Sequence, residues 1–193
     1  MNKTDYYIPL YNECLYHIYN RGNGREKIFY EPANYAYFHK QYEKYISEFV
    51  DTYAFCLLPN HFHLLVKIKH KESGIISEAF RKLFISYSMS INKQQQRKGS
   101  LFQRGFKRKL INAEKYFYAA VYYIHSNPVH HRLVPDFKKY KYSSFSLLSG
   151  EKETKLCRSE VMDWFGGKDN FMKYHLEKDR KNYDYSFMIE DDE

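Results

Sequence analysis

Cysteine, proline and glycine are all scarce in this chain, which has three, five and eight of them among 193 residues. The cysteines, Cys14, Cys56 and Cys157, show no disulfide-framework, metal-ligand or redox spacing, so we expect reduced thiols and a cytoplasmic protein. A hydrophobic content of 44% with so little proline and glycine excludes a collagen-like chain and argues against a disordered one.

Long apolar runs are also missing. No stretch approaches the roughly 18 consecutive apolar residues of a membrane-spanning helix. Residues 1–13 contain no apolar segment of the kind found in signal peptides. We therefore expect no membrane partner. The length is typical of one domain and suffices to bury a core without disulfides or a structural metal.

Acidic side chains are absent from residues 79–113, and nine basic ones lie in the same block. The basic residues are Arg81, Lys82, Lys93, Arg97, Lys98, Arg104, Lys107, Arg108 and Lys109. A solvated surface normally mixes both signs, so this block, in a chain of net charge +8, predicts contact with nucleic-acid phosphates. Tyr87, Phe102 and Phe106 lie in the same block, and we expect them either to stack on unpaired bases or to belong to the core.

Hydrophobic periodicity predicts an α+β fold. Alternation indicates strands at residues 15–20, 52–58, 61–69 and 106–111, and helical spacing indicates helices at 32–50 and 75–96. This order is that of a ferredoxin-like split βαβ antiparallel sheet with two helices on one face. An added helix at residues 113–126 is expected to end near Asn127-Pro128, and short helices and a frayed acidic tail are expected over residues 140–193.

His61 and His63 form the sharpest local signal. Two residues that are two positions apart on a strand lie on the same face, while Phe62 between them faces the opposite side. Adjacent imidazoles can bind one divalent metal ion. They can equally belong to a polar sheet face, and the pattern alone does not choose between these interpretations.

Tyr123 and Asn127 form the second signal. They are four positions apart and share one face of the predicted helix. A tyrosine hydroxyl can act as the nucleophile of phosphoryl transfer, and an amide oxygen can complete a metal shell. Tyr116, Tyr118 and Tyr122 are close by, so spacing alone does not select Tyr123.

Taken together, the chain resembles single-tyrosine transposases of the HUH endonuclease superfamily, in the branch of the REP-associated tyrosine transposases and IS-type transposases. The resemblance rests on YHIYNRGNGREKIFYE (16–31), YAFCLLPNHFHLLVK (53–67), GSLFQRGFKRKLI (99–111), YIHSNPVHHRLV (123–134) and YSSFSLLSG (142–150). It implies a catalytic domain over residues 1–150, with 151–193 as a C-terminal extension of the same domain. It also implies DNA transposition or the processing of repeated palindromes.

The resemblance further implies which residues carry the chemistry. Tyr123 corresponds to the nucleophile that cleaves single-stranded DNA and forms a 5′-phosphotyrosine intermediate, and His61, His63 and Asn127 correspond to the ligands of Mg²⁺ or Mn²⁺. The implied partners are single-stranded and hairpin DNA and a second copy of the chain. A non-catalytic single-stranded nucleic-acid-binding protein of the same fold, or a structural protein with a metal site, remain the alternatives.

Six residues are the candidates for DNA contact. Arg21, Asn23 and Arg25 belong to the turn after the first strand, and Arg104, Lys107 and Arg108 belong to the acid-free block. The glycines of the turn can also serve only to make it tight, with its charges solvated. We expect His125 on the surface of its helix rather than in a proton relay, and His17 on a sheet face.

Overall fold

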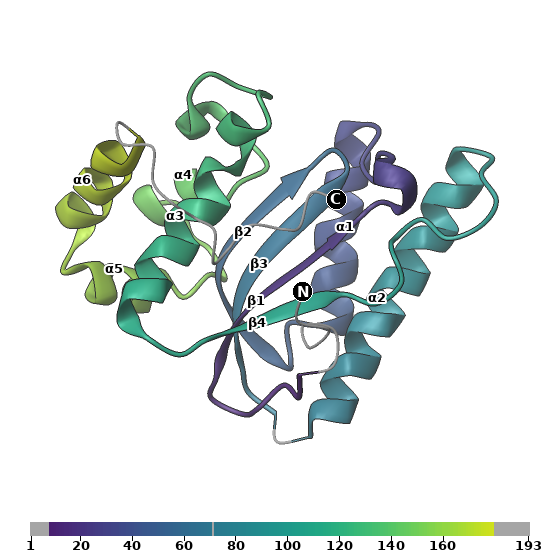
Figure 1. Cartoon of the computed structure of the whole chain (residues 1–193), viewed down its shortest axis with the longest axis horizontal. Coiled ribbons are helices and arrows are strands. Elements are labelled where there is room, and N and C mark those ends of the chain that lie inside the picture. Colours follow the sequence, from purple (N-terminus) through teal and green to yellow (C-terminus); the bar gives the residue numbers. More distant parts are fainter. Residues whose placement is uncertain (1–7, 71, 180–193) are drawn as a thin grey trace.

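A four-stranded antiparallel sheet lies at the centre of the computed structural model, which describes residues 8–70 and 72–179 (Figure 1). The strands are β1 (Leu15–Arg21), β2 (Val50–Leu58), β3 (His61–Ile68) and β4 (Lys107–Ile111). Their order is β2-β3-β1-β4, and each neighbouring pair is antiparallel. The predicted ferredoxin-like arrangement is therefore confirmed.

Helices α1 (Pro32–Tyr45) and α2 (Ser73–Gln94) cover one face of the sheet. Helical spacing turns one apolar stripe of α2 inward, and Phe62 of β3 meets this core as expected. The buried positions of the stripe are Ile76, Ala79, Phe80, Leu83, Tyr87 and Ile91. Tyr87, Phe102 and Phe106 are thus buried members of this core.

The first helix ends five residues earlier than the apolar spacing predicts, at Tyr45 rather than Val50. Val50 instead opens β2 and pairs with Ile68 of β3. Ile46 and Phe49 continue the apolar spacing because the connecting turn packs on the same core, not because it is helical.

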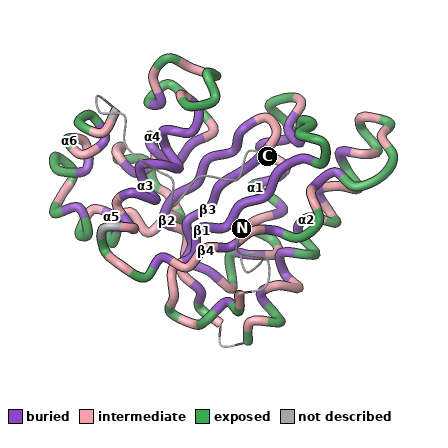
Figure 2. Tube along the Cα trace, viewed as in Figure 1, coloured by how far each residue is buried: buried purple, intermediate pink, exposed green. Residues whose placement is uncertain are grey.

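Helix α3 (Glu114–His130) packs on the opposite face of the sheet, together with α4 (Phe145–Ser149), α5 (Arg158–Phe165) and α6 (Lys168–Asp179). This second core joins Cys56 and Leu65 of the sheet to Phe117 of α3 and Phe171 of α6. Both faces of the sheet are therefore covered, and β1, β2 and β3 are buried along nearly their whole length (Figure 2).

The prediction that α3 ends near Asn127-Pro128 was wrong, because the helix continues through Pro128 to His130. Proline lacks one N–H donor, but the following turn closes through the N–H of His131 to the carbonyl of Asn127 and that of Leu133 to Pro128. The surrounding residues, Ile124 to Asn127, are all buried, so tertiary packing outweighs the local preference.

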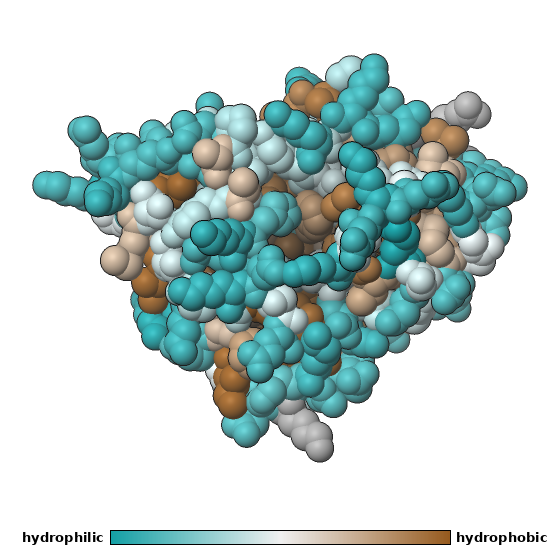
Figure 3. Space-filling view, turned by 180° about the vertical axis from the view of Figure 1, so that it is seen from behind, coloured by the Kyte–Doolittle hydropathy of each residue, from teal (hydrophilic) through white to brown (hydrophobic). Residues whose placement is uncertain are grey.

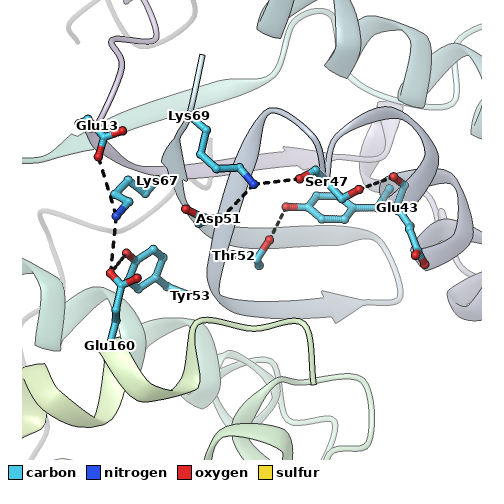
Figure 4. A network of polar contacts seen from close by, with 10 residues as sticks. Glu13, Glu43, Ser47, Asp51, Thr52, Tyr53, Lys67, Lys69 and Glu160 are labelled. Atoms are coloured by element: carbon cyan, nitrogen blue, oxygen red, sulfur yellow. Dashed lines mark hydrogen bonds and ion pairs between the residues drawn. The ribbon is translucent and has the colours of Figure 1, made fainter. Parts of the chain in front are cut away.

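Polar contacts also fasten α5 to the sheet (Figure 4). Tyr53 of β2 donates a hydrogen bond to Glu160 of α5, and Lys67 of β3 lies 3.6 Å from Glu160 and 3.9 Å from Glu13. Such partly exposed ion pairs contribute little stability, so burial of aromatic residues mainly holds α5 and α6 in place. The predicted short helices are confirmed as far as residue 179, and the acidic tail lies outside the described residues.

The cysteines Cys14, Cys56 and Cys157 are free thiols. Within the described ranges, none of the helices has the length and apolar character needed to cross a membrane.

Candidate functional site

Three histidines lie side by side on the sheet face that α3 covers. His17 comes from β1, and His61 and His63 come from the neighbouring β3. In the ladder, Tyr19 of β1 is opposite His63, so the alternation of both strands turns these side chains to the same face. The rings of His61 and His63 are perpendicular, with their centroids 5.1 Å apart.

One nitrogen of each β3 histidine is held by a neighbour. His61 Nδ1 lies 2.7 Å from the Asn60 side-chain oxygen, and His63 Nδ1 lies 2.9 Å from His17 Nε2. Because the Asn60 oxygen only accepts, His61 donates from Nδ1 and keeps its lone pair on Nε2, a buried atom that makes no hydrogen bond. Metal-binding histidines are typically oriented through their second nitrogen in this way.

Helix α3 brings the predicted tyrosine to this cluster. The Tyr123 ring lies edge-on to His63, with centroids 5.5 Å apart, and edge-on to His17 at 5.9 Å. The neighbouring tyrosines point elsewhere: Tyr122 packs in the second core, with its ring 5.5 Å from His175, and Tyr118 bonds to the carbonyl of Trp164. The tertiary structure thus places Tyr123, and neither Tyr118 nor Tyr122, beside the histidines.

Asn127 lies one turn beyond Tyr123 and is only 1% exposed. Its amide nitrogen donates to the backbone carbonyl of Tyr123 at 2.8 Å, which leaves the amide oxygen as its remaining polar atom. The Asn127 side chain is close enough to His61 to act on the pKa of that imidazole, raising it against the larger effect of burial. The structure therefore brings the four residues predicted for catalysis and metal binding into one cluster.

Burial keeps the histidines of this cluster neutral. It lowers the pKa of His17 to about 3 and places the pKa values of His61 and His63 well below the ordinary histidine value. The neighbouring positive charge of Arg21 adds to the effect on both β3 residues. A neutral imidazole is the form that ligates a metal ion.

Two further histidines of the cluster escaped sequence reasoning. The His131 ring lies 4.5 Å from that of His61, and the His130 ring lies 6.5 Å from that of Tyr123. The signal was present, since Tyr123, Asn127 and His131 follow one another at helical spacing. It was hidden by the expectation that the helix ends near Asn127-Pro128.

The fit of this cluster to a metal ion rests on nitrogen and amide donors. In the described part of the chain, no group of three or more His, Cys, Asp or Glu side chains is arranged to hold an ion. The two β3 imidazoles and the amide oxygen of Asn127 are the donor groups that this cluster could offer a divalent ion. Such a donor set leaves coordination positions open, which suits a site that must also bind a phosphate.

The segment that contains all these elements has known relatives. The profile of the family described as "Transposase IS200 like" matches residues 10–127, from just before β1 to Asn127. The chain belongs to this family. The match includes His61, His63, Tyr123 and Asn127, whereas His130 and His131 lie beyond its end.

Two members of the REP-associated branch are similar to this transposase-family chain. A protein of Haemophilus influenzae, provisionally named a REP-associated tyrosine transposase, is 32% identical over 103 residues, which are 49% of this chain and 58% of the relative. A solved structure of a REP-associated tyrosine transposase bound to a REP hairpin has a TM-score of 0.61 at 20% identity, over 76% of this chain and 84% of that one. The second match shows that the folds are alike.

The predicted DNA-contacting residues of this family member do not form one patch. Arg21 is buried and acts on His61 electrostatically, and Lys107 lies over the Tyr19 ring at 5.7 Å, so both are on the histidine side. Asn23 and Arg25 are exposed in the short helix η1 (Asn23–Arg25). Arg108 points to the opposite face, where it bonds to Ile8 and Ser77.

A groove of about 1220 Å³ runs between α2 and the segment 99–108, on the α2 side of the sheet. Arg81, Arg104 and Arg108 line it, and none of its described lining residues is acidic. Arg108 Nε is buried there without a hydrogen-bond partner, whereas Arg81 pairs with Glu78. The surface seen from behind is mostly hydrophilic, with scattered apolar residues (Figure 3). The basic side chains of the acid-free block, residues 79–113, thus lie on both sides of the sheet, with Lys107 on the histidine side and Arg104 in the groove.

Proposed function

We propose that this protein is a metal-dependent transposase that cleaves and rejoins single-stranded DNA beside a hairpin. One observation carries the proposal: the Tyr123 ring, presented by α3, lies edge-on to His63, within the cluster that also contains His61 and Asn127. A phenol next to two neutral imidazoles and an amide is the arrangement required for tyrosine attack on a metal-bound phosphate.

His61 and His63, through their Nε2 atoms, and Asn127, through its amide oxygen, are the proposed ligands of Mg²⁺ or Mn²⁺. The buried, unbonded Nε2 of His61 supports this assignment, because such an atom is costly unless something binds it. When bound, the cation withdraws charge from the scissile phosphate. Asn60 and His17 hold the two imidazoles in the required orientation.

The Tyr123 hydroxyl oxygen forms a bond to the scissile phosphorus as the bond to the 3′-oxygen breaks. The phenol loses its proton and the departing 3′-oxygen gains one, so the products are a 5′-phosphotyrosine ester and a free 3′-hydroxyl. The ester conserves the energy of the original bond. A second 3′-hydroxyl can therefore reverse the step and join two strands.

Hairpin DNA is the proposed substrate because a structural relative is bound to a REP hairpin. Lys107 and Arg21, beside the histidines, are proposed to contact the strand that is cleaved. Asn23 and Arg25 at the turn, and Arg104 and Arg108 in the groove, are proposed to contact the remaining DNA. The position of Arg21 and Lys107 on the histidine side, and of Arg104 and Arg108 in the groove on the α2 side, supports this division.

Two further proposals concern organisation. Residues 1–150 are proposed as the catalytic domain and 151–193 as its extension, supported by the packing of α5 and α6 in the same core as α3. A homodimer is proposed from the family resemblance alone. Sedimentation equilibrium with and without hairpin DNA tests it, and a mass equal to one chain under both conditions contradicts it.

Covalent adduct formation tests the enzymatic proposal. Wild-type protein is incubated with Mn²⁺ and a hairpin carrying a single-stranded flank labelled on the 3′ side of the cleavage site, and the label should become attached to the protein. Tyr123→Phe should abolish the adduct while hairpin binding persists, and Tyr122→Phe is the matched control. A wild-type protein that binds hairpins but forms no adduct over a range of flanks would point to the non-catalytic alternative.

A further inference from the structure

A buried chain of hydrogen bonds joins the C-terminal helix α6 to α3 and to the sheet. His175 Nε2 of α6 lies 2.9 Å from His125 Nδ1 of α3, and His125 Nε2 lies 2.8 Å from Ser144 Oγ at the start of α4. Backbone groups end the chain: His175 Nδ1 lies 2.8 Å from the Phe171 carbonyl, and the Phe55 N–H of β2 donates to Ser144 Oγ at 2.9 Å. The three side chains are fully buried, so the expectation of a surface position for His125 was wrong.

The backbone groups at both ends set the direction of the chain. A carbonyl oxygen only accepts, so His175 carries its proton on Nδ1 and accepts at Nε2. His125 then donates from Nδ1 and accepts the Ser144 hydroxyl at Nε2; the alternative acceptor of that hydroxyl, the Phe55 carbonyl, is farther away at 3.1 Å. Burial lowers the pKa of His175 to about 4 and that of His125 well below the ordinary value, so both imidazoles stay neutral.

The position of His125 on α3 places this chain of hydrogen bonds close to the tyrosine site. His125 is two positions from Tyr123 and two from Asn127, and residues two apart in a helix point in nearly opposite directions. The hydrogen bonds of His125 therefore hold one side of α3. The opposite side of the same helical turns carries Tyr123 and Asn127, the proposed nucleophile and amide ligand.

We propose that His125 and His175 are positioning residues, through which α6 sets the rotation of α3 and hence the place of Tyr123 and Asn127. This inference rests on the proposed function. The apolar neighbours of α3 hold it against the sheet, but apolar contact is not directional, whereas a hydrogen bond between two rings is. Rotation of α3 by about 10° moves an atom ~6 Å from its axis by about 1 Å.

His175→Phe tests the proposal, because it keeps a ring in place but removes the acceptor for His125. At saturating hairpin DNA and Mn²⁺, the rate of adduct formation should fall by about 10- to 100-fold, as expected for a displacement near 1 Å. The dissociation constant for the hairpin should not change. His175→Gln, which restores an acceptor near the position of Nε2, should recover most of the rate.

Ser144→Ala removes the hydroxyl at the other end of the hydrogen-bond chain, and it should lower the rate of adduct formation without changing hairpin binding. This variant keeps the test valid if His175→Phe does not fold. Val161→Ala in α5 is the control, since it removes buried apolar atoms without touching the chain. All rates are compared well below each variant's melting temperature. Side-chain ¹⁵N spectra of the wild type should show both histidines protonated on Nδ1.

The outcomes separate the two proposals. Suppose that the wild type forms the adduct. If His175→Phe and Ser144→Ala lower the rate of adduct formation no more than Val161→Ala does, the positioning role alone is overturned. Protonation of either histidine on Nε2 overturns it as well. A wild-type protein without any adduct contradicts the proposed function, and the positioning role fails with it.

Discussion

The ring of Tyr123 meets the ring of His63 edge-on, with the ring planes at 84° and the centroids 5.5 Å apart. The two residues come from α3 and β3, which belong to distant parts of the chain. Their contact makes a single site out of the tyrosine of the helix and the histidines of the sheet.

Divalent metal should stabilise the folded protein through His61 and His63. At a free Mn²⁺ concentration of about 100 times the dissociation constant, the expected gain in unfolding free energy is about 2.7 kcal/mol. Thermal melting with and without Mn²⁺ measures it. His61→Ala or His63→Ala should abolish the shift, whereas His70→Ala, outside the cluster, should retain it; an equal shift in all four proteins would contradict the ligand assignment.

His17 should tune the affinity of the proposed metal site without binding the ion. Its Nε2 is the partner of His63 Nδ1, and loss of such a supporting contact typically weakens metal binding by about 10- to 100-fold. Mn²⁺ titration of His17→Phe, followed by electron paramagnetic resonance, should show this loss. His39→Phe, a histidine of α1, is the control, and an unchanged affinity in His17→Phe would show that His63 needs no support.

Acid should destabilise the protein because its buried histidines are neutral. Their folded pKa values lie below the unfolded value near 6.5, so the unfolded chain binds more protons, and stability present above pH 6.5 is lost as the pH falls toward 4 and below. Each such histidine contributes up to about 1.4 kcal/mol per pH unit. Urea unfolding between pH 7 and 4.5 measures the slope.

The same measurement has an internal control. His17→Phe should reduce the slope of unfolding free energy against pH by the contribution of about one proton taken up on unfolding, because one titrating group has been removed. A stability that is flat between pH 7 and 4.5 would mean that these imidazoles are not buried as neutral groups in solution.

Salt should weaken hairpin binding in proportion to the phosphates contacted. For single-stranded contacts, the slope of log K against log salt concentration is about −0.7 per phosphate. Arg104→Gln and Lys107→Gln should each make the slope shallower by about that amount. Lys155→Gln, whose side chain pairs with Glu43 away from the groove, should leave it unchanged; equal effects of all three substitutions would argue against specific contact surfaces.

Alternation and helical spacing predicted most of the fold because each buried face repeats a local pattern. The inward stripe of α2 and the opposite orientation of Phe62 and its two histidine neighbours follow directly from these periods. The errors lie at element ends, at Val50 and at Pro128, where pairing with Ile68 or burial of the surrounding turn outweighs local preference. The second error concealed His131 as a neighbour of His61.

The sequence by itself determined the strand and helix order, the shared face of His61 and His63, and the shared face of Tyr123 and Asn127, because these depend only on backbone periodicity. Only the tertiary structure decided that the two faces meet, that Tyr123 rather than Tyr122 lies there, and that His17, His125 and His175 are buried partners. Those facts depend on how α3 and α6 pack on the sheet, and packing between distant segments is not encoded in any local pattern.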